Sequence, residues 1–309
     1  MDIFAQQLIN GLILGSIYAL IALGYTMVYG ILGLINFAHG EIVMIGAMVC
    51  ITCLSFLLGH YGDLSPLLLV FASVLMAIPV CALLGYSIER VAYRPLRKAP
   101  RLAPLITAIG VSIVLQNLAM MIWGRQYVPF PAIFSNVPYQ VFGASITPLQ
   151  VSIIVLAGVM MLGLVVLVQK TKLGRAMRAT AQNPQVASLM GVNVNQVIAL
   201  TFILGSCLGS VAGIMVAANY GQAHAYMGFL LGLKAFSAAV LGGIGNIAGA
   251  VIGGLLLGII ESLGAGYIGD LTNDFLGSQY QDIFAFLVLI TVLVFKPSGL
   301  MGEKVSERP

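Results

Sequence analysis

Charged residues are scarce in this chain. Only 8% of its 309 residues are Asp, Glu, Lys or Arg, 60% are hydrophobic, and the mean hydropathy is +1.04. Soluble globular proteins carry about 25% charged residues. A chain so poor in charge cannot cover a soluble surface. This excludes a soluble enzyme or a nucleic-acid-binding protein and predicts an all-α integral membrane protein with several spanning helices.

Metal-binding and redox side chains are also few. The four cysteines, Cys50, Cys53, Cys81 and Cys207, lie in apolar stretches, and the chain has three histidines. Cys50 and Cys53 form a C-x-x-C pair, but no second pair or ligand histidines flank it, as a zinc site requires. We therefore expect buried thiols, no metal site, no catalytic residues and no cofactor bound by this chain.

Two sequence patterns are missing altogether. None of the lysines follows a glycine, which excludes the phosphate-binding pattern G-x-x-x-x-G-K-[ST]. If the protein transports actively, another chain must hydrolyse ATP, or an ion gradient must drive it. No Lys or Arg precedes the first apolar run, so we expect that run to remain as a spanning segment rather than a cleaved signal peptide.

Long charge-free intervals, by contrast, run through the whole chain. Residues 179–233 and 235–260, for example, contain no Asp, Glu, Lys or Arg. A spanning helix needs about 20 apolar residues. Broken at proline, glycine and polar clusters, the intervals predict about 8–9 spanning segments in a single transmembrane domain, 1–309. The candidates lie near 8–29, 42–58, 67–88, 102–122, 149–168, 196–218, 229–243, 247–266 and 280–295.

The basic residues predict the orientation of these segments. Twelve of the fourteen Lys and Arg residues lie in 90–101, 170–178 and 296–308, and cytoplasmic loops concentrate such residues. With all three clusters inside, the C-terminus is cytoplasmic and the N-terminus lies outside. Nine spans satisfy this parity if the glycine-rich stretch 242–254 is a turn on the cytoplasmic side. A re-entrant hairpin there would give fewer true spans.

The longest cytoplasmic connection, about 170–196, contains the signals of a short helix. Asn183 can cap it, Pro184 suits its first position, and Gly191 suits the residue after its end. We expect a helix over 184–190. It is either a basic anchor that turns the chain or a coupling helix that docks into a groove of a partner protein.

Polar residues interrupt the first apolar region at LINFAHGEIVMIGA, residues 34–47. One helix over 8–37 would be about 45 Å long, against a hydrocarbon core of about 30 Å. We therefore expect the helix either to tilt strongly or to break, and Gly30 and Gly33 are the expected break points. Broken helices at membrane depth line cavities in transporters, which makes Asn36, His39 and Glu41 candidates for a translocation pathway. The alternative is a hydrated helix end at the membrane interface.

Lys234 and Glu261 bracket a long uncharged stretch. A lone charge inside a membrane is costly, so each should have a partner or face water. The two residues either pair with each other, line the external mouth of a pathway, or extend their charged groups to the interface.

The stretch GGIGNIAGAVIGG, 242–254, contains a G-x-G-x-x-A pattern, and Glu261 follows at a spacing typical of dinucleotide-binding folds. Such a fold needs soluble β-α-β units, for which the surrounding sequence lacks charged helix faces. Glycines spaced by four residues instead favour close helix packing. We assign this role to Gly205, Gly209, Gly213, Gly245, Gly249 and Gly253.

Several long runs resemble one family across almost the whole chain. They include GSIYALIALGYTMVYGILGLINFAHGE (15–41), SIERVAYRPLR (87–97), LGRAMRA (173–179) and KAFSAAVLGGIGNIAGAVIGG (234–254). They are similar to the LivH-type permease of high-affinity branched-chain amino acid ABC importers.

The resemblance implies a multi-pass permease subunit of a bacterial inner membrane that moves leucine, isoleucine or valine by alternating access. Its partners would be a second homologous permease, two cytoplasmic ATPases that use ATP and Mg, and an external or periplasmic solute-binding protein. Sibling permeases for urea and short amides share much of the pattern, so the alternatives are a permease for urea, short amides or other amino acids, or an ion-driven carrier that works alone. The family's ATPase-coupling segment falls on 173–197 and contains Gly174, Arg175, Arg178, Pro184, Ala187 and Gly191.

Overall fold

The structure is a computed structural model, and it describes residues 2–97, 99–100, 102–133, 137–141, 143–272, 280–296 and 298–302. It divides into two compact units. Unit 1 comprises Met1–Thr26, Ser135–Met161 and Leu233–Pro309, and unit 2 comprises Met27–Phe134 and Leu162–Gly232. Because the boundaries fall inside α1, α5 and α9, each of these helices contributes to both units.

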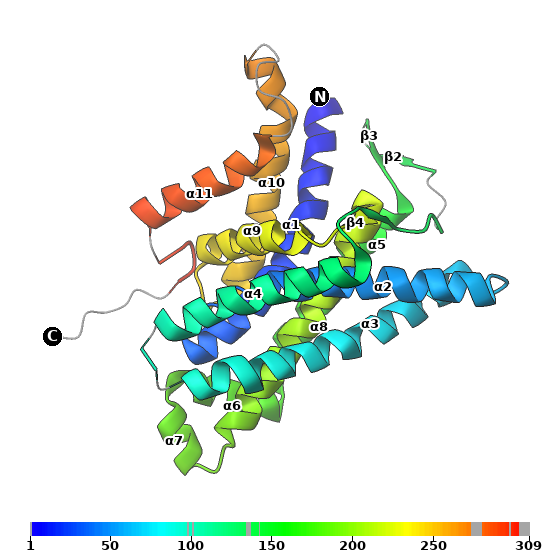
Figure 1. Ribbon diagram of the computed structural model, residues 1–309. Helices are drawn as coiled ribbons and strands as arrows, with labels where there is room; N and C mark the ends of the chain where they lie inside the picture. Colours follow the sequence, from blue (N-terminus) through cyan, green and yellow to red (C-terminus); the bar gives the residue numbers. More distant parts are fainter. Residues whose placement is uncertain are drawn as a thin grey trace. The chain divides into compact units, whose positions relative to one another are not determined.

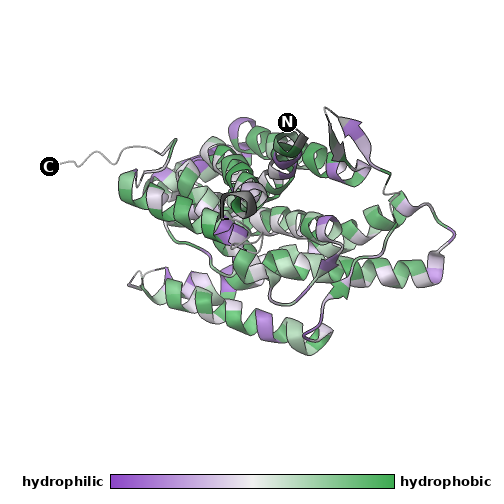
Figure 2. Ribbon diagram, turned by 90° about the horizontal axis from the view of Figure 1, so that it is seen from above, coloured by the Kyte–Doolittle hydropathy of each residue, from purple (hydrophilic) through white to green (hydrophobic). Residues whose placement is uncertain are grey.

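The described chain is almost entirely helical (Figure 1). Seven helices among the described residues are long and apolar enough to cross a membrane, and two further apolar helices are shorter. Figure 2 shows hydrophobic residues along most of the helical ribbon. The expected all-α membrane fold is confirmed. The long helices are α1 (Asp2–Leu32), α2 (His39–Tyr61), α3 (Pro66–Ile88), α4 (Leu102–Trp123), α5 (Pro148–Lys170), α8 (Val194–Tyr220) and α10 (Ile247–Thr272); the shorter ones are α9 (Met227–Gly242) and α11 (Gln281–Phe295).

Polar side chains define several of the helix starts. Thr147 and Gln150 form a reciprocal capping box before α5, in which each side chain accepts a hydrogen bond from the other residue's backbone N–H. The Asn193 side chain caps α8 through the Gln196 N–H, at 3.2 Å. Since the long helices are apolar along most of their length, such caps, rather than amphipathic periodicity, mark these two starts.

The first apolar region breaks as expected. Helix α1 ends at Leu32, Gly33 adopts φ +63°, and α2 begins at His39. Only glycine enters this left-handed region freely. Gly30, the other expected break point, remains helical.

The proline-rich connection after α4 contains short strands that the sequence did not reveal. In unit 2, β1 (Val128–Pro129) pairs antiparallel with β4 (Gln222–Ala223). In unit 1, β2 (Tyr139–Val141) pairs with β3 (Ala144–Ile146).

The connection 170–196, expected on the cytoplasmic side, contains two helices rather than one. The expected helix is present as α7 (Pro184–Leu189), and Asn183 accepts hydrogen bonds from the Gln185 and Val186 N–H groups. It is preceded by α6 (Lys172–Gln182), which Thr171 caps through the Gly174 N–H.

In unit 1, glycines of α10 bring helix backbones together. A Cβ at Gly254 or Gly258 would lie closer than 3.0 Å to Ala19 or Gly15 of α1, and one at Gly249 or Gly253 would meet backbone atoms of α9 at similar distances. Gly245 is different. It precedes α10, has φ +97° and has no other described atom within 4 Å of a built Cβ. Our assignment of Gly245 to a packing face is therefore wrong, because this glycine serves the turn.

In unit 2, the glycine face of α8 packs on α2. A Cβ at Gly213 would collide with the Val43 carbonyl, and one at Gly209 would lie 3.3 Å from the His39 ring. Gly205 is buried on the same helix. Gly85 of α3 leaves room for the Ser206 hydroxyl from α8 in the same way.

Several residues of the basic and acidic connections lie outside the described residues. They are Lys98, Arg101, Asp274, Lys304 and Arg308.

Candidate coupling and translocation sites

The coupling candidates form a compact helical hairpin in unit 2. A Cβ at Gly174 would collide with the carbonyls of Leu167 and Val168, so α6 turns back directly onto the end of α5. The Arg178 guanidinium donates to the Val168 carbonyl, which satisfies one of the unpaired carbonyls at that helix end. Arg175 is exposed.

Helix α7 exposes an apolar tip. Ala187 is buried, with 4% exposure, whereas Leu189 and Met190 are 87% and 81% exposed. Gly191 ends the helix at φ +85°, and Pro184 is exposed at its start. Large exposed apolar side chains on a basic connection form a surface suited to a protein groove.

The interruption between α1 and α2, in unit 2, holds three of the pathway candidates. Asn36 lies within it, and His39 and Glu41 lie in the first turn of α2; none is more than 1% exposed. The Tyr93 hydroxyl donates to the Asn36 side-chain oxygen at 3.1 Å. The Ser112 hydroxyl donates to Glu41 Oε1 at 3.0 Å, and Glu41 Oε2 has no hydrogen-bond partner among the described residues. Burial in the protein is not what a hydrated helix end would give.

Lys234 and Glu261 pair in unit 1. Lys234 Nζ lies 2.6 Å from Glu261 Oε1 and 2.5 Å from Asp282 Oδ1, so one cation lies between two carboxylates. The Tyr18 hydroxyl donates to the same Glu261 oxygen at 3.2 Å. Lys234 and Glu261 are 4% and 0% exposed, which argues against side chains that reach out to the interface.

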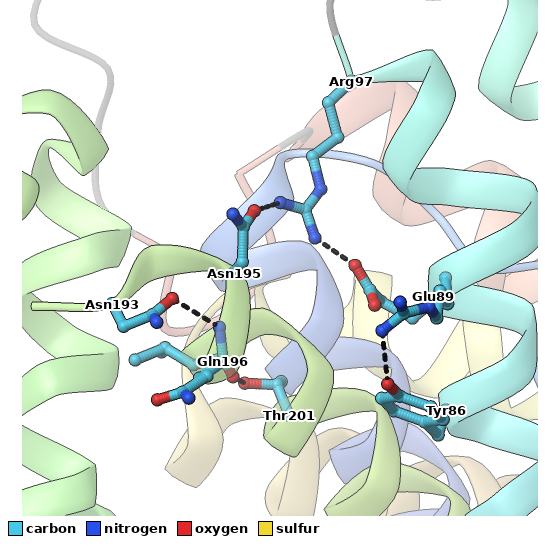
Figure 3. A network of polar contacts seen from close by, with 9 residues as sticks. Tyr86, Glu89, Arg97, Asn193, Asn195, Gln196 and Thr201 are labelled. Carbon is cyan, nitrogen blue, oxygen red and sulfur yellow. Dashed lines mark hydrogen bonds and ion pairs between the residues drawn. The ribbon is translucent and has the colours of Figure 1, made fainter.

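A third polar network joins α3 to the start of α8 in unit 2 (Figure 3). Arg97 forms an ion pair with Glu89 and donates to the Asn195 side-chain oxygen at 2.7 Å. Glu89 is only 1% exposed. Burial lowers the pKa of the Arg97 guanidinium, and the neighbouring Glu89 carboxylate opposes that shift.

The backbone beside this network departs from α-helical geometry. Helix α3 continues into a π-helical turn, η1 (Glu89–Tyr93), and then a 3₁₀ turn, η2 (Arg94–Leu96). Pro95 cannot donate to the preceding turn, so the α-helix cannot continue there. Single π turns inside helices are frequent at functional sites.

Sequence reasoning missed Asp282, Tyr18, Ser112 and Tyr93 as partners of the buried polar residues, and it treated Arg97 only as part of a basic cluster. The pair Glu89 and Arg97, eight residues apart in an otherwise basic segment, was the available signal. Within the described ranges, no group of three or more His, Cys, Asp or Glu side chains could hold a metal ion.

Comparison with known proteins identifies the relationship. The family model described as "Branched-chain amino acid transport system / permease component" matches residues 7–293. This chain belongs to that permease family.

Near-full-length relatives agree with the family match. The high-affinity branched-chain amino acid transport system permease proteins BraD of Pseudomonas aeruginosa and LivH of Escherichia coli K12 are each 46% identical to this chain. The alignments cover 99% of this chain and 98% and 97% of those proteins. A probable branched-chain amino acid transport permease protein LivH of Methanocaldococcus jannaschii is 30% identical over 97% of this chain and 94% of its own length.

Proposed function

We propose that this protein is the membrane-spanning permease subunit of an ATP-binding-cassette importer for leucine, isoleucine and valine in the bacterial inner membrane. The observation that carries the proposal is 46% identity, over 99% of the chain, to permeases of high-affinity branched-chain amino acid transport. This chain supplies the translocation pathway and performs no catalysis of its own.

The partners follow from this role. A second homologous permease completes the pathway, two cytoplasmic ATPases bind ATP and Mg, and an external solute-binding protein delivers the amino acid. The exposed apolar tip of α7, Leu189 and Met190, supports a docking role for the connection 170–196. ATP binding biases the permease between inward- and outward-facing states because ATP has different affinities for the two.

Uptake by the reconstituted complex tests the proposal. The complex is co-purified through a tag on this chain and reconstituted into proteoliposomes. ATP is enclosed inside the vesicles, the binding protein is added outside, and uptake of radiolabelled leucine is measured. We expect uptake that requires ATP, the ATPases and the binding protein. Uptake of radiolabelled urea and of a short amide is measured under the same conditions for comparison.

Two outcomes would contradict the proposal. Uptake by this chain alone, driven by an ion gradient, would make it a carrier. ATP-dependent uptake of urea or amide without uptake of leucine would assign it to a different substrate class.

A further inference from the structure

Helix α7 is joined to α8 by a short, fixed turn. The Val192 N–H donates to the Ala187 carbonyl and the Gly191 N–H to the Ser188 carbonyl, both at 3.0 Å. With Gly191 in the left-handed region, these bonds form a Schellman ending. Asn193 then caps α8. A displacement of α7 therefore acts on the first turn of α8 without a flexible linker between them.

That first turn is held by Arg97. The guanidinium donates to Asn195, one residue into α8, and also pairs with the buried Glu89 carboxylate at the start of η1 (Figure 3). The planar guanidinium carries several fixed donors, so it can bridge two acceptors in a defined geometry that an ammonium group does not reproduce.

The other end of η1 reaches the interruption between α1 and α2. Tyr93 is 1% exposed, and its ring centroid lies 5.2 Å from that of Phe202 in α8. Its single hydroxyl proton is within reach of two acceptors, the Asn36 side-chain oxygen at 3.1 Å and the Ile35 carbonyl at 3.3 Å. Asn36 lies in the interruption, close in sequence to the buried Glu41. Contacts between neighbouring side chains and backbone groups thus form a continuous path from α7 to the buried polar break, entirely within unit 2.

We propose that η1 and Arg97 form the mechanical linkage that carries the movement of the coupling helix to the interrupted segment 33–38. This proposal rests on the proposed function. The π-helical turn is its two-state element, because a shift between π and α hydrogen bonding would displace Tyr93 relative to Glu89 without unfolding α3. Arg97, Glu89 and Tyr93 are positioning residues, and none of them needs to touch the substrate.

The test measures leucine transported per ATP hydrolysed in the reconstituted complex. Arg97→Gln and Tyr93→Phe should each reduce this ratio about tenfold, within the 5- to 150-fold range typical of coupled sites, while assembly and basal ATPase activity stay near native. Arg97→Lys keeps the charge but not the bridge, so it should not restore the ratio. Arg90→Gln is the matched control, since Arg90 is exposed and its guanidinium donates to the Tyr86 hydroxyl rather than to α8.

The outcomes separate the linkage from the proposed function. The linkage is overturned if both Tyr93→Phe and Arg97→Lys transport as much leucine per ATP as the native complex. In that case neither the Tyr93 hydroxyl nor the guanidinium bridge is needed. If Arg97→Gln fails to assemble, Tyr93→Phe decides, because it removes a single hydroxyl. Leu189→Ser, which alters the docking tip, should weaken ATPase association. Absence of ATP-dependent uptake in the native complex would instead overturn the proposed function.

Discussion

At the residue scale, the buried cluster around Lys234 shows how charge survives in an apolar chain. One ammonium faces the carboxylates of Glu261 and Asp282, and Tyr18 adds a hydroxyl donor. Removing one member of a buried ion pair leaves an uncompensated charge, which costs about 3–5 kcal/mol. Loss of any one charged member of the cluster should therefore destabilise the folded protein.

Lys234→Met should lower the unfolding temperature of the detergent-solubilised complex, because it leaves the fully buried Glu261 carboxylate without its cation. The second carboxylate, on a side chain 33% exposed, should contribute less, because water screens it. The double variant Lys234→Met, Glu261→Gln should regain part of the loss, and a double-mutant cycle measures the coupling. Equal unfolding temperatures for Lys234→Met and the native protein would contradict this account.

The sequence was informative about part of this cluster. Lys234 and Glu261 stood out because no other charge separates them, and the cost of burying either alone predicted a partner. Asp282 could not be assigned in this way. It lies at the start of α11 beyond residues 273–279, and no local pattern relates the start of one apolar helix to the middle of another.

At the element scale, glycine determines which helices approach closely. The helices α10 and α1 of unit 1, and α8 and α2 of unit 2, meet where a Cβ would collide with the opposing backbone. Inside a membrane, hydrophobic burial does not drive helices together, so close backbone contact contributes much of the packing energy. The four-residue spacing revealed these faces, but it could not show that Gly245 falls in the turn.

Gly253→Leu should disrupt the hairpin of α9 and α10, because a side chain there would meet the Ala238 carbonyl and the backbone of Gly242. Overpacking typically costs about 1–3 kcal/mol and often more against backbone. The expected result is a lower unfolding temperature and loss of assembled complex on size-exclusion chromatography. Gly110→Leu is the control, since no described atom lies within 4 Å of a Cβ at that helical glycine. Similar behaviour of the two variants would argue against glycine packing.

Helix signals in the sequence were reliable where they were local and polar. The position of α7 was predicted correctly from Asn183, Pro184 and Gly191, because each of these residues affects only the backbone within a few residues of itself. The preceding α6 was missed, although Thr171 offered the same kind of cap. The strands β1–β4 have two or three residues each, too few for an alternating pattern to appear.

At the scale of the whole molecule, several contacts between connections agree with the parity derived from charge. Gln6 near the N-terminus bonds to Ser145, and β1 pairs with β4, all in connections assigned to the outside. Arg97 and Asn195 meet in connections assigned to the inside. The turn after α9 bonds to the segment after α11, through the Leu300 N–H and the Leu241 carbonyl, and both are assigned to the inside. One contact departs from this pattern: in unit 2 a Cβ at Gly40, at the start of α2, would collide with the Gly228 carbonyl at the start of α9, although nine crossings place these two helix starts on opposite sides.

The two short helices make this parity testable. At 1.5 Å per residue, the 16 residues of α9 and the 15 of α11 give lengths of about 24 and 22 Å, less than the hydrocarbon thickness of about 30 Å. If α9 and α10 both cross, the turn between them is cytoplasmic. If they form a re-entrant hairpin, that turn lies within the membrane and only the two ends of the hairpin reach the outside.

Labelling single cysteines with a membrane-impermeant maleimide distinguishes these cases. The four native cysteines, all within candidate spans, are first replaced by alanine. Ala248→Cys, exposed in the first turn of α10, should react in inverted vesicles and not in intact spheroplasts. Two controls calibrate the assay. Arg175→Cys lies in a connection rich in Lys and Arg and should react as Ala248→Cys does, whereas Asp63→Cys lies in a connection without Lys or Arg and should react only in spheroplasts. Failure of Ala248→Cys to react in inverted vesicles, with both controls as expected, would replace the crossings of α9 and α10 by a re-entrant hairpin and reduce the number of spans.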